Sequence, residues 1–267
     1  MISVVIPTLG LMNEKNLKYQ INNNTEKVPF EIIFCVPRKN FSKLIKYKKY
    51  KHIKIVLSNY HNQVKQRLEG IKHAKYNLIL QLDDDIYLKE FFITQLFNSS
   101  KILRSKFCLS PIYRYYDTNK KIYNTPSSLK IFLYKFFFQV DLNKSYGRLS
   151  NFGLAFDFSP YSKNIDNVEW LPGGCMLTNK SYFKNYDTSI FKNYEKSYYE
   201  DVFFSIKSKN KKFIDNRLSV YLFKEKHNEN LFLNLKYFNK IFLFNKKKNL
   251  IKYSIYIIYR CLKRIIF

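Results

Sequence analysis

The sequence predicts an α/β fold in which a mostly parallel, Rossmann-like central sheet is flanked by helices. Three observations lead to this fold class. Short apolar runs of strand length recur as far as residue 223, stretches with helical spacing lie between several of them, and some runs stop abruptly at a proline or at acidic residues. With 267 residues, of which 46% are hydrophobic, the chain can also bury a sizeable core.

The predicted strands alternate with predicted helices. Strands are expected at residues 2–6, 30–36, 53–57, 77–82, 107–111 and 219–223, and helices at 13–23, 62–75 and 88–103. Proline ends the first, second and fifth strands, because its ring fixes the backbone and removes a hydrogen-bond donor. This alternation is typical of parallel βαβ units.

The strand at residues 77–82 ends in three consecutive carboxylates, Asp83, Asp84 and Asp85. Ligands bind at this edge of open α/β sheets, and adjacent carboxylates repel one another unless a cation neutralises them. Mg²⁺ or Mn²⁺ prefers oxygen ligands and links carboxylates to phosphates, so Asp83 and Asp85 are candidate ligands of an ion that holds a nucleotide diphosphate. The alternative is a solvated acidic turn that stabilises the start of the next helix.

Two further polar residues are expected near this edge. Thr8 follows Pro7 at the end of the first strand, where its hydroxyl could contact a base or a ribose, or where the pair could simply end the strand. Arg67 lies on the predicted helix 62–75. If its side chain points along the sheet edge, it can pair with Asp83 or with a phosphate; on the exposed side it would be an ordinary surface residue.

A glycine pair marks a second informative stretch. Gly173 and Gly174 stand between Trp170 and a strand-like run, and they allow a positive φ and a close approach of the backbone to a ligand. Trp170, the only tryptophan, could stack on a sugar face or fill the core. These residues are therefore candidates for contact with a ligand.

Glu200 and Asp201 precede an apolar stretch that we predict to be a helix. A carboxylate at the N-terminus of a helix is stabilised and can be held there as a general base. The alternative is that both acids only cap the helix.

The chain carries a formal net charge of +27, and lysine supplies most of its basic residues. Because this composition matches the bias of an AT-rich genome, and no nucleic-acid-binding motif accompanies it, we predict no nucleic-acid partner. An anionic membrane surface remains a plausible partner.

The four cysteines are widely separated and lack the spacing of a metal site, which fits a reducing cytosol. The N-terminus lacks the basic region and the long apolar run of a signal peptide, and no run approaches the roughly 20 apolar residues that cross a bilayer. We expect a cytoplasmic protein that is peripheral on the inner face of the cell membrane.

Two regions depart from the regular pattern. Residues 113–166 form an irregular insertion whose aromatic cluster at 131–138 we predict to be core, although it could face a membrane or an acceptor. Residues 228–267 are predicted to be a basic helical tail. Its basic side chains gather on about one third of a helical wheel, which is the pattern of an interfacial helix.

In their order along the chain, these pieces resemble a family 2 glycosyltransferase of the GT-A fold over residues 1–227. The motifs that carry the resemblance are Pro7-Thr8, the approach at 67–77 to the aspartates at 83–85, the glycine segment 170–176, Glu200-Asp201, and His227. Two positions depart from the family pattern. The second strand ends in 35–38 without the usual acidic residue, and Asn62 stands where the family has glycine.

The resemblance implies roles for these residues. It assigns Asp83, Asp84 and Asp85 to the sugar-nucleotide diphosphate, with Asp83 and Asp85 on Mn²⁺ or Mg²⁺; Pro7, Thr8 and Arg67 to the donor; Trp170, Gly173 and Gly174 to the acceptor side; Asp201 to the general base, with Glu200 beside it; and His227 to the metal or the diphosphate. Reaction by in-line displacement inverts the anomeric carbon.

The predicted function is sugar transfer from a nucleotide-diphosphate sugar to a glycan or glycolipid acceptor, in the synthesis of a bacterial cell-surface glycan such as lipopolysaccharide, O-antigen or capsule. Nucleotidyl transfer is an alternative that lacks a glycine-rich phosphate loop. A non-catalytic basic protein that binds nucleic acid or membrane is a further alternative, which leaves the acidic clusters unexplained.

Overall fold

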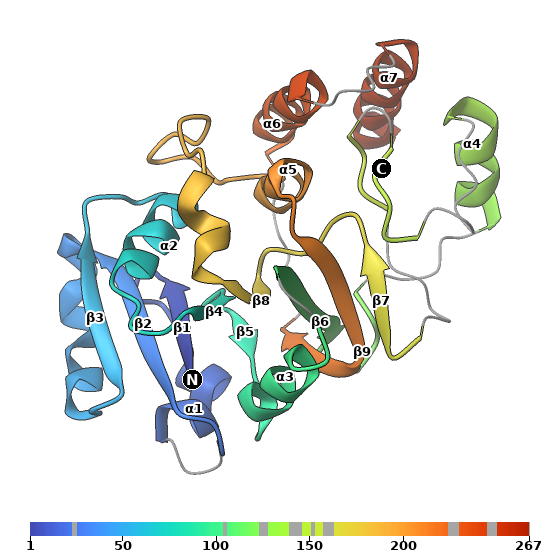
Figure 1. The fold of residues 1–267 in the computed structure, drawn as a ribbon. Coiled ribbons are helices and arrows are strands. Elements are labelled where there is room, and N and C mark those ends of the chain that lie inside the picture. The colour runs from blue at the N-terminus through green and yellow to red at the C-terminus, as the bar shows by residue number, and fades with distance from the viewer. Residues whose placement is uncertain are drawn as a thin grey trace.

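A single mixed sheet forms the centre of the molecule (Figure 1). The computed structural model describes residues 1–22, 26–103, 106–122, 128–138, 146–150, 153–156, 163–223, 230–244 and 250–266. Its strands are β1 (Ile2–Pro7), β2 (Phe30–Pro37), β3 (Ile53–Ser58), β4 (Leu78–Leu82), β5 (Ile86–Tyr87), β6 (Phe107–Tyr115), β7 (Ile165–Val168), β8 (Cys175–Asn179) and β9 (Lys211–Leu222).

The strand order is β3-β2-β1-β4-β8-β6-β9-β5, and β7 also pairs with β9. Strands β1 to β4 are parallel, as the alternating pattern predicts. Strand β8 lies antiparallel between β4 and β6, while β6 and β9 are parallel. The predicted α/β class with a mostly parallel sheet is confirmed.

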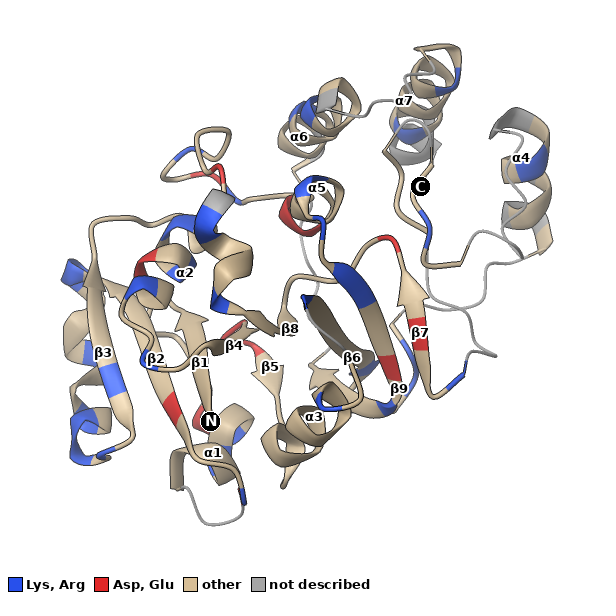
Figure 2. Cartoon of the chain, in the orientation of Figure 1, with Lys and Arg blue, Asp and Glu red and all other residues tan. Residues whose placement is uncertain are grey.

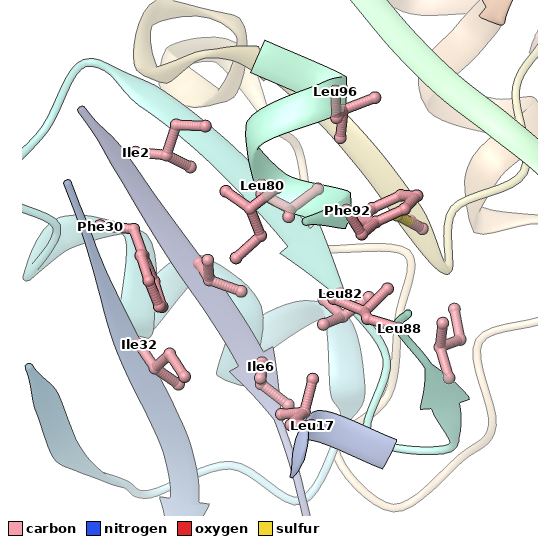
Figure 3. Close-up of a cluster of buried hydrophobic side chains, with 14 of the residues drawn as sticks. Ile2, Ile6, Leu17, Phe30, Ile32, Leu80, Leu82, Leu88, Phe92 and Leu96 are labelled. Carbon is pink, nitrogen blue, oxygen red and sulfur yellow. The ribbon is translucent and has the colours of Figure 1, made fainter. Parts of the chain in front are cut away.

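Helices cover both faces of the sheet. The α-helices are α1 (Lys18–Asn22), α2 (Gln63–Lys72), α3 (Phe92–Ser100), α4 (Ser128–Phe138), α5 (Glu200–Lys207), α6 (Leu231–Phe244) and α7 (Leu250–Ile266), and the 3-10 helices are η1 (Glu14–Leu17), η2 (Arg38–Lys49) and η4 (Lys180–Asn185). Successive strand residues point to opposite faces. Ile6 of β1 therefore packs in one cluster with Leu17 of η1 and Phe92 of α3 (Figure 3), while Val5 belongs to the opposite cluster with Ile71 of α2.

Three predicted elements have clearly different limits in the structure. The strand expected to end at Pro111 continues to Tyr115 as β6, because this proline lies at a register shift against β9 and not at the end of the strand. The helix expected at 88–103 begins only at Phe92, because residues before it form β5 and the backbone N–H of Leu88 donates to the Asn16 carbonyl at 2.9 Å. The strand expected at 219–223 is the end of the much longer β9. Its register against β6 shifts after Pro111, and this irregularity hides the first half of the strand in the sequence pattern.

Helices α4, α6 and α7 lie together at one end of the molecule (Figure 1). Tyr134 of α4 is buried as predicted for the aromatic cluster at 131–138, whereas Phe132 and Phe136 are exposed, so the prediction of a buried core is wrong for these two residues. Within the described residues, no helix combines the length and the apolar character needed to cross a bilayer.

Candidate active site

The three aspartates after β4 lie at the carboxyl edge of the sheet, beside the end of β1. The Thr8 hydroxyl donates to Asp84 Oδ2 at 2.5 Å, and Asn16 Nδ2 donates to the Asp84 carbonyl at 3.0 Å. Burial raises the pKa of Asp84. Asp84 thus joins the acidic turn to β1 and η1, while Asp85 is exposed to solvent.

Arg67 joins this turn to the second acidic pair. Its guanidinium is 1% exposed; Nη2 donates to Asp83 Oδ1 at 2.9 Å and Nη1 donates to Glu200 Oε1 at 2.7 Å. Gln63 Nε2 donates to the same Asp83 oxygen at 2.6 Å. Burial opposes the charged guanidinium, yet the carboxylates of Glu200 and Asp83 raise the pKa of Arg67 above its ordinary value. The helix therefore points Arg67 toward the carboxylates, one of the two directions that the sequence left open.

Glu200 and Asp201 form the first turn of α5. Burial raises the pKa of Glu200 to about 7 and that of Asp201 to about 6, although Arg67 opposes the shift at Glu200 and a hydrogen bond from the Val202 N–H, at 2.8 Å, opposes it at Asp201. A carboxylate with a pKa near neutrality is suited to accept a proton at neutral pH.

The residue before this pair, Tyr199, has a φ of 57°, a left-handed conformation that bulky residues rarely adopt. Its hydroxyl donates to Asn234 Oδ1 of α6 at 2.9 Å, and its ring packs on Phe238. Contacts with α6 therefore hold the backbone turn from which Glu200 and Asp201 project.

Gly173 and Gly174 lie between the two acidic clusters. An added Cβ at Gly173 would lie 3.2 Å from Glu200 Oε1, and one at Gly174 would lie 3.1 Å from Asp83 Oδ2. The Asp83 N–H donates to the Gly174 carbonyl at 2.7 Å, and the Gln81 side-chain amide donates to the Gly173 carbonyl. Neither glycine has a positive φ, so close approach to the carboxylates, and not a left-handed turn, is what favours glycine here.

A cleft of about 840 Å³ opens at this edge of the sheet, within the size range of ligand sites. It is lined by Pro7, Thr8, Leu9, Leu11, Asn13, Asn16, His61, Gln63, Gln66, Asp83, Asp84, Asp85, Tyr115, Ile122, Lys196, Leu222 and Phe223. All three aspartates reach it, whereas Glu200 and Asp201 are not among its lining residues.

Asn62 organises one wall of the cleft. Its Oδ1 caps α2 by accepting from the Val64 N–H at 3.1 Å, and its Nδ2 donates to the Glu195 carbonyl at 2.9 Å and to Ser197 Oγ at 2.7 Å. Asn62, which stands where the family has glycine, thus ties the loop at 192–197 to the start of α2.

This loop stacks an exposed aromatic side chain on His61, which lines the cleft. Tyr194 stacks on His61, with 5.0 Å between ring centroids and 25° between planes, and the His61 N–H donates to Asn193 Oδ1 at 2.8 Å. Neither residue was a sequence candidate. The cap residue Asn62 is the only local signal near them, since their pairing joins segments more than a hundred residues apart in the chain.

Trp170, the remaining candidate that the structure describes, packs in the core. Trp170 is 5% exposed, and its Nε1 donates to the Phe156 carbonyl at 2.8 Å within an apolar cluster that includes Phe203. These surroundings match the core alternative for Trp170. His227 lies outside the described residues.

The acidic turn offers few protein ligands for a metal ion. Across the described ranges, no group of three or more His, Cys, Asp or Glu residues is arranged to hold a metal ion. Asp83 Oδ1 already accepts from Arg67 and Gln63, while Asp85 lies exposed in the cleft. This donor set fits an ion that is held by one or two carboxylates together with substrate phosphates and water, and it does not fit an ion held by protein alone.

No protein-family model matches the chain, and no curated protein sequence matches it. Solved structures match at the level of the fold. S. aureus TarS in complex with UDP-GlcNAc has 14% sequence identity over 85% of this chain, with a TM-score of 0.54. GalNAc-T7 with UDP, GalNAc and Mn²⁺ has 12% identity over 90% of this chain, with a TM-score of 0.61.

Both proteins are glycosyltransferases of the GT-A type. This chain has the GT-A fold. It spans 59% of the length of the TarS chain and 47% of that of the GalNAc-T7 chain. Identities this low establish a shared fold, and the predicted resemblance to a GT-A glycosyltransferase is confirmed at that level.

Proposed function

We propose that this chain is an inverting glycosyltransferase that moves a sugar from a nucleotide-diphosphate sugar to an acceptor hydroxyl. The observation that carries the proposal is the bridge formed by buried Arg67 between Asp83, at the cleft, and Glu200, next to Asp201. Acids suited to a diphosphate site and acids suited to proton abstraction thereby belong to one hydrogen-bonded cluster. The complexes of TarS with UDP-GlcNAc and of GalNAc-T7 with UDP support a nucleotide-sugar donor.

The donor diphosphate would lie at the cleft edge formed by Pro7, Thr8 and the three aspartates. We assign Arg67 a positioning role: because the guanidinium is buried and paired on both sides, it holds Asp83 in place and leaves the phosphates to groups that reach the cleft. Asp84, paired with Thr8, fixes the shape of the turn.

When bound, Mn²⁺ or Mg²⁺ neutralises the charge that develops on the departing nucleoside diphosphate. Asp83 and Asp85 are the residues that would hold it, together with phosphate oxygens of the donor. The Mn²⁺ in the GalNAc-T7 structure supports this choice of ion. A contribution from His227 remains a prediction.

The transfer step needs a base for the acceptor hydroxyl, and we assign this role to Asp201. The acceptor oxygen forms a bond to the anomeric carbon while the bond from that carbon to the diphosphate oxygen breaks. The hydroxyl proton passes to the Asp201 carboxylate, and the electron pair of the broken bond stays on the diphosphate. With a pKa of about 6, Asp201 is ionised at neutral pH and still basic enough to accept the proton.

The stacked pair of His61 and Tyr194 is a candidate platform for the nucleotide base. The second strand ends without the acidic residue that the family uses at this point, so this chain needs another means of holding the base. Aromatic rings stack on any base, because every base presents a π-face.

We assign the acceptor to a glycan or glycolipid of the bacterial cell surface, as in lipopolysaccharide, O-antigen or capsule. The family resemblance of the motifs supports this assignment. Gly173 and Gly174, which lie against both acidic clusters, are the residues that we place on the acceptor side.

A screen of nucleotide sugars tests the proposal. The chain is mixed with UDP-, dTDP-, GDP- and CMP-sugars in the presence of Mn²⁺, and thermal stability and donor hydrolysis are measured. A true donor at about 100 times its dissociation constant should stabilise the fold by roughly 2.7 kcal/mol. If no nucleotide sugar stabilises the protein or is hydrolysed, the proposed function is wrong.

A further inference from the structure

Helices α4, α6 and α7 pack on one another through a shared apolar cluster. Tyr134 of α4, Phe238 of α6 and Tyr256 of α7 are all buried in it. Each helix therefore uses one face for packing against the other two.

The remaining faces carry large apolar side chains in contact with water. Phe132 and Phe136, one turn apart on α4, are 61% and 68% exposed, and their rings stack with 5.9 Å between centroids. Ile251 and Ile258 of α7 are 75% and 59% exposed. Leu250 of α7 is also exposed, as are Phe232 and Leu243 of α6. Apolar side chains gathered in this way mark an interaction surface.

The charges on these helices have one sign. None of the three contains Asp or Glu, and their basic residues are Lys130, Lys135, Lys236, Lys240, Lys252, Arg260, Lys263 and Arg264. Figure 2 shows the resulting absence of red on α4, α6 and α7. Lys236 and Lys240 donate inward, to Glu195 and to the Ile190 carbonyl, whereas Lys135 on α4 is exposed.

Apolar side chains combined with purely basic charge match an anionic lipid surface. A second copy of this chain is a poorer match, because each copy carries a formal net charge of +27 and the same basic helices. Charge complementarity therefore favours an anionic lipid surface over a second copy of this chain.

We propose that α4 and α7 dock this protein on an anionic lipid bilayer, with the Phe132–Phe136 pair inserted among the lipid headgroups. Helix α6, which packs with α4 and α7, is joined to the candidate site, since its Tyr237 hydroxyl donates to Glu195 Oε2 at 3.0 Å and its Asn234 accepts from the Tyr199 hydroxyl. Docking would bring the site to an acceptor in the membrane, and this purpose rests on the proposed function.

Vesicle flotation of the full chain tests the docking. We expect flotation with vesicles of phosphatidylglycerol and phosphatidylcholine and little with phosphatidylcholine alone. Raising the salt concentration from about 0.1 M to about 1 M shortens the Debye length from roughly 10 Å to roughly 3 Å. It should therefore weaken flotation with the anionic vesicles. The double variant Phe132→Ser/Phe136→Ser should bind the anionic vesicles about tenfold more weakly or worse.

A matched control is Ile45→Ser/Ile102→Ser, which also removes two exposed apolar side chains but lies away from these helices. It should float like the unchanged protein. Failure of the unchanged chain to float, or equal flotation of the two double variants, would overturn the proposal.

A second measurement holds even if the serine variant folds poorly. Phe136→Trp should show fluorescence that is quenched by brominated acyl chains in the anionic vesicles, and Ile102→Trp should not. Equal quenching of the two would contradict insertion at α4. Because no nucleotide is present, the outcome is independent of donor binding: flotation without any nucleotide-sugar binding would leave the docking intact and remove only its assigned purpose.

Discussion

Arg67 of α2 and Glu200 of α5 form a buried ion pair, 2.7 Å from Nη1 to Oε1, across 133 positions of the chain. Removing one partner of a buried pair leaves the other charge uncompensated, which typically costs about 3–5 kcal/mol. Arg67→Met should lower the free energy of unfolding by this amount in urea denaturation. Lys72→Met on the same helix, which breaks an exposed pair with Glu69, should cost less than about 1 kcal/mol. Equal costs would show that the Arg67 bridge does not organise the fold.

Asp201 is the assigned base, so Asp201→Asn should keep donor binding and lower turnover by roughly 10²-fold or more. Glu200→Gln is the informative companion, because Glu200 adjoins Asp201 and has the higher pKa. Turnover and calorimetric donor binding are measured for both. If the Asp201 variant turns over normally and the Glu200 variant does not, the two roles are exchanged.

The pH dependence of kcat/KM should follow the ionisation of Asp201. The base works only as a carboxylate, so kcat/KM should rise with pH through about 6 and level off above it. The free energy of unfolding should change with pH in the opposite direction. Since burial raises the pKa values of Asp201 and Glu200 in the folded state, their contribution to stability is full below pH 4 and is lost as pH rises through about 6 to 7. Glu200→Gln should flatten this fall in the free energy of unfolding.

Asp85→Ala should abolish Mn²⁺-dependent donor binding, because Asp85 is an exposed carboxylate of the cleft and the remaining carboxylates cannot complete an oxygen-ligand set around a divalent ion. Calorimetry with a UDP-sugar, with and without Mn²⁺, measures the loss. Asp117→Ala, an exposed aspartate after β6, serves as the control and should bind normally. Unchanged affinity at Asp85→Ala would remove this residue from the metal site.

Tyr194→Ala should weaken nucleotide binding, since a base stacked on an aromatic ring contributes about 1–3 kcal/mol, or roughly fivefold to 150-fold in Kd. Tyr194→Phe keeps the ring and should bind like the unchanged protein. The Kd for the free nucleotide is the measurement. If alanine and phenylalanine variants bind alike, the stacked pair does not hold the base.

The parallel half of the sheet could be predicted from the sequence because strands buried on both faces read as continuous apolar runs. The same property concealed the direction of β8, whose run at Cys175–Asn179 looks like its neighbours but pairs antiparallel. The first half of β9 was missed for another reason. Asp215 and Arg217 pair with each other at the register shift, and this polar interruption breaks the apolar pattern.

The residues of the candidate site could be proposed from motifs, but the partners of these residues could not. Helical spacing places Arg67 on α2 without naming the carboxylates that it meets, since Glu200 comes from a distant element. The stacking of Tyr194 on His61 depends likewise on Asn62 holding a distant loop. Contacts of this range depend on the whole fold, which local propensity does not encode.

The position of β8 between β4 and β6 also constrains the order of folding. A nascent chain that has formed only the β1–β4 layer already carries Asp83, but the Gly174 carbonyl that accepts its N–H belongs to a much later segment. Pairing across so long an intervening chain loses loop entropy before any contact compensates for it, so it is a slow event. The ability to bind a nucleotide should therefore emerge late in refolding, after most of the secondary structure has formed.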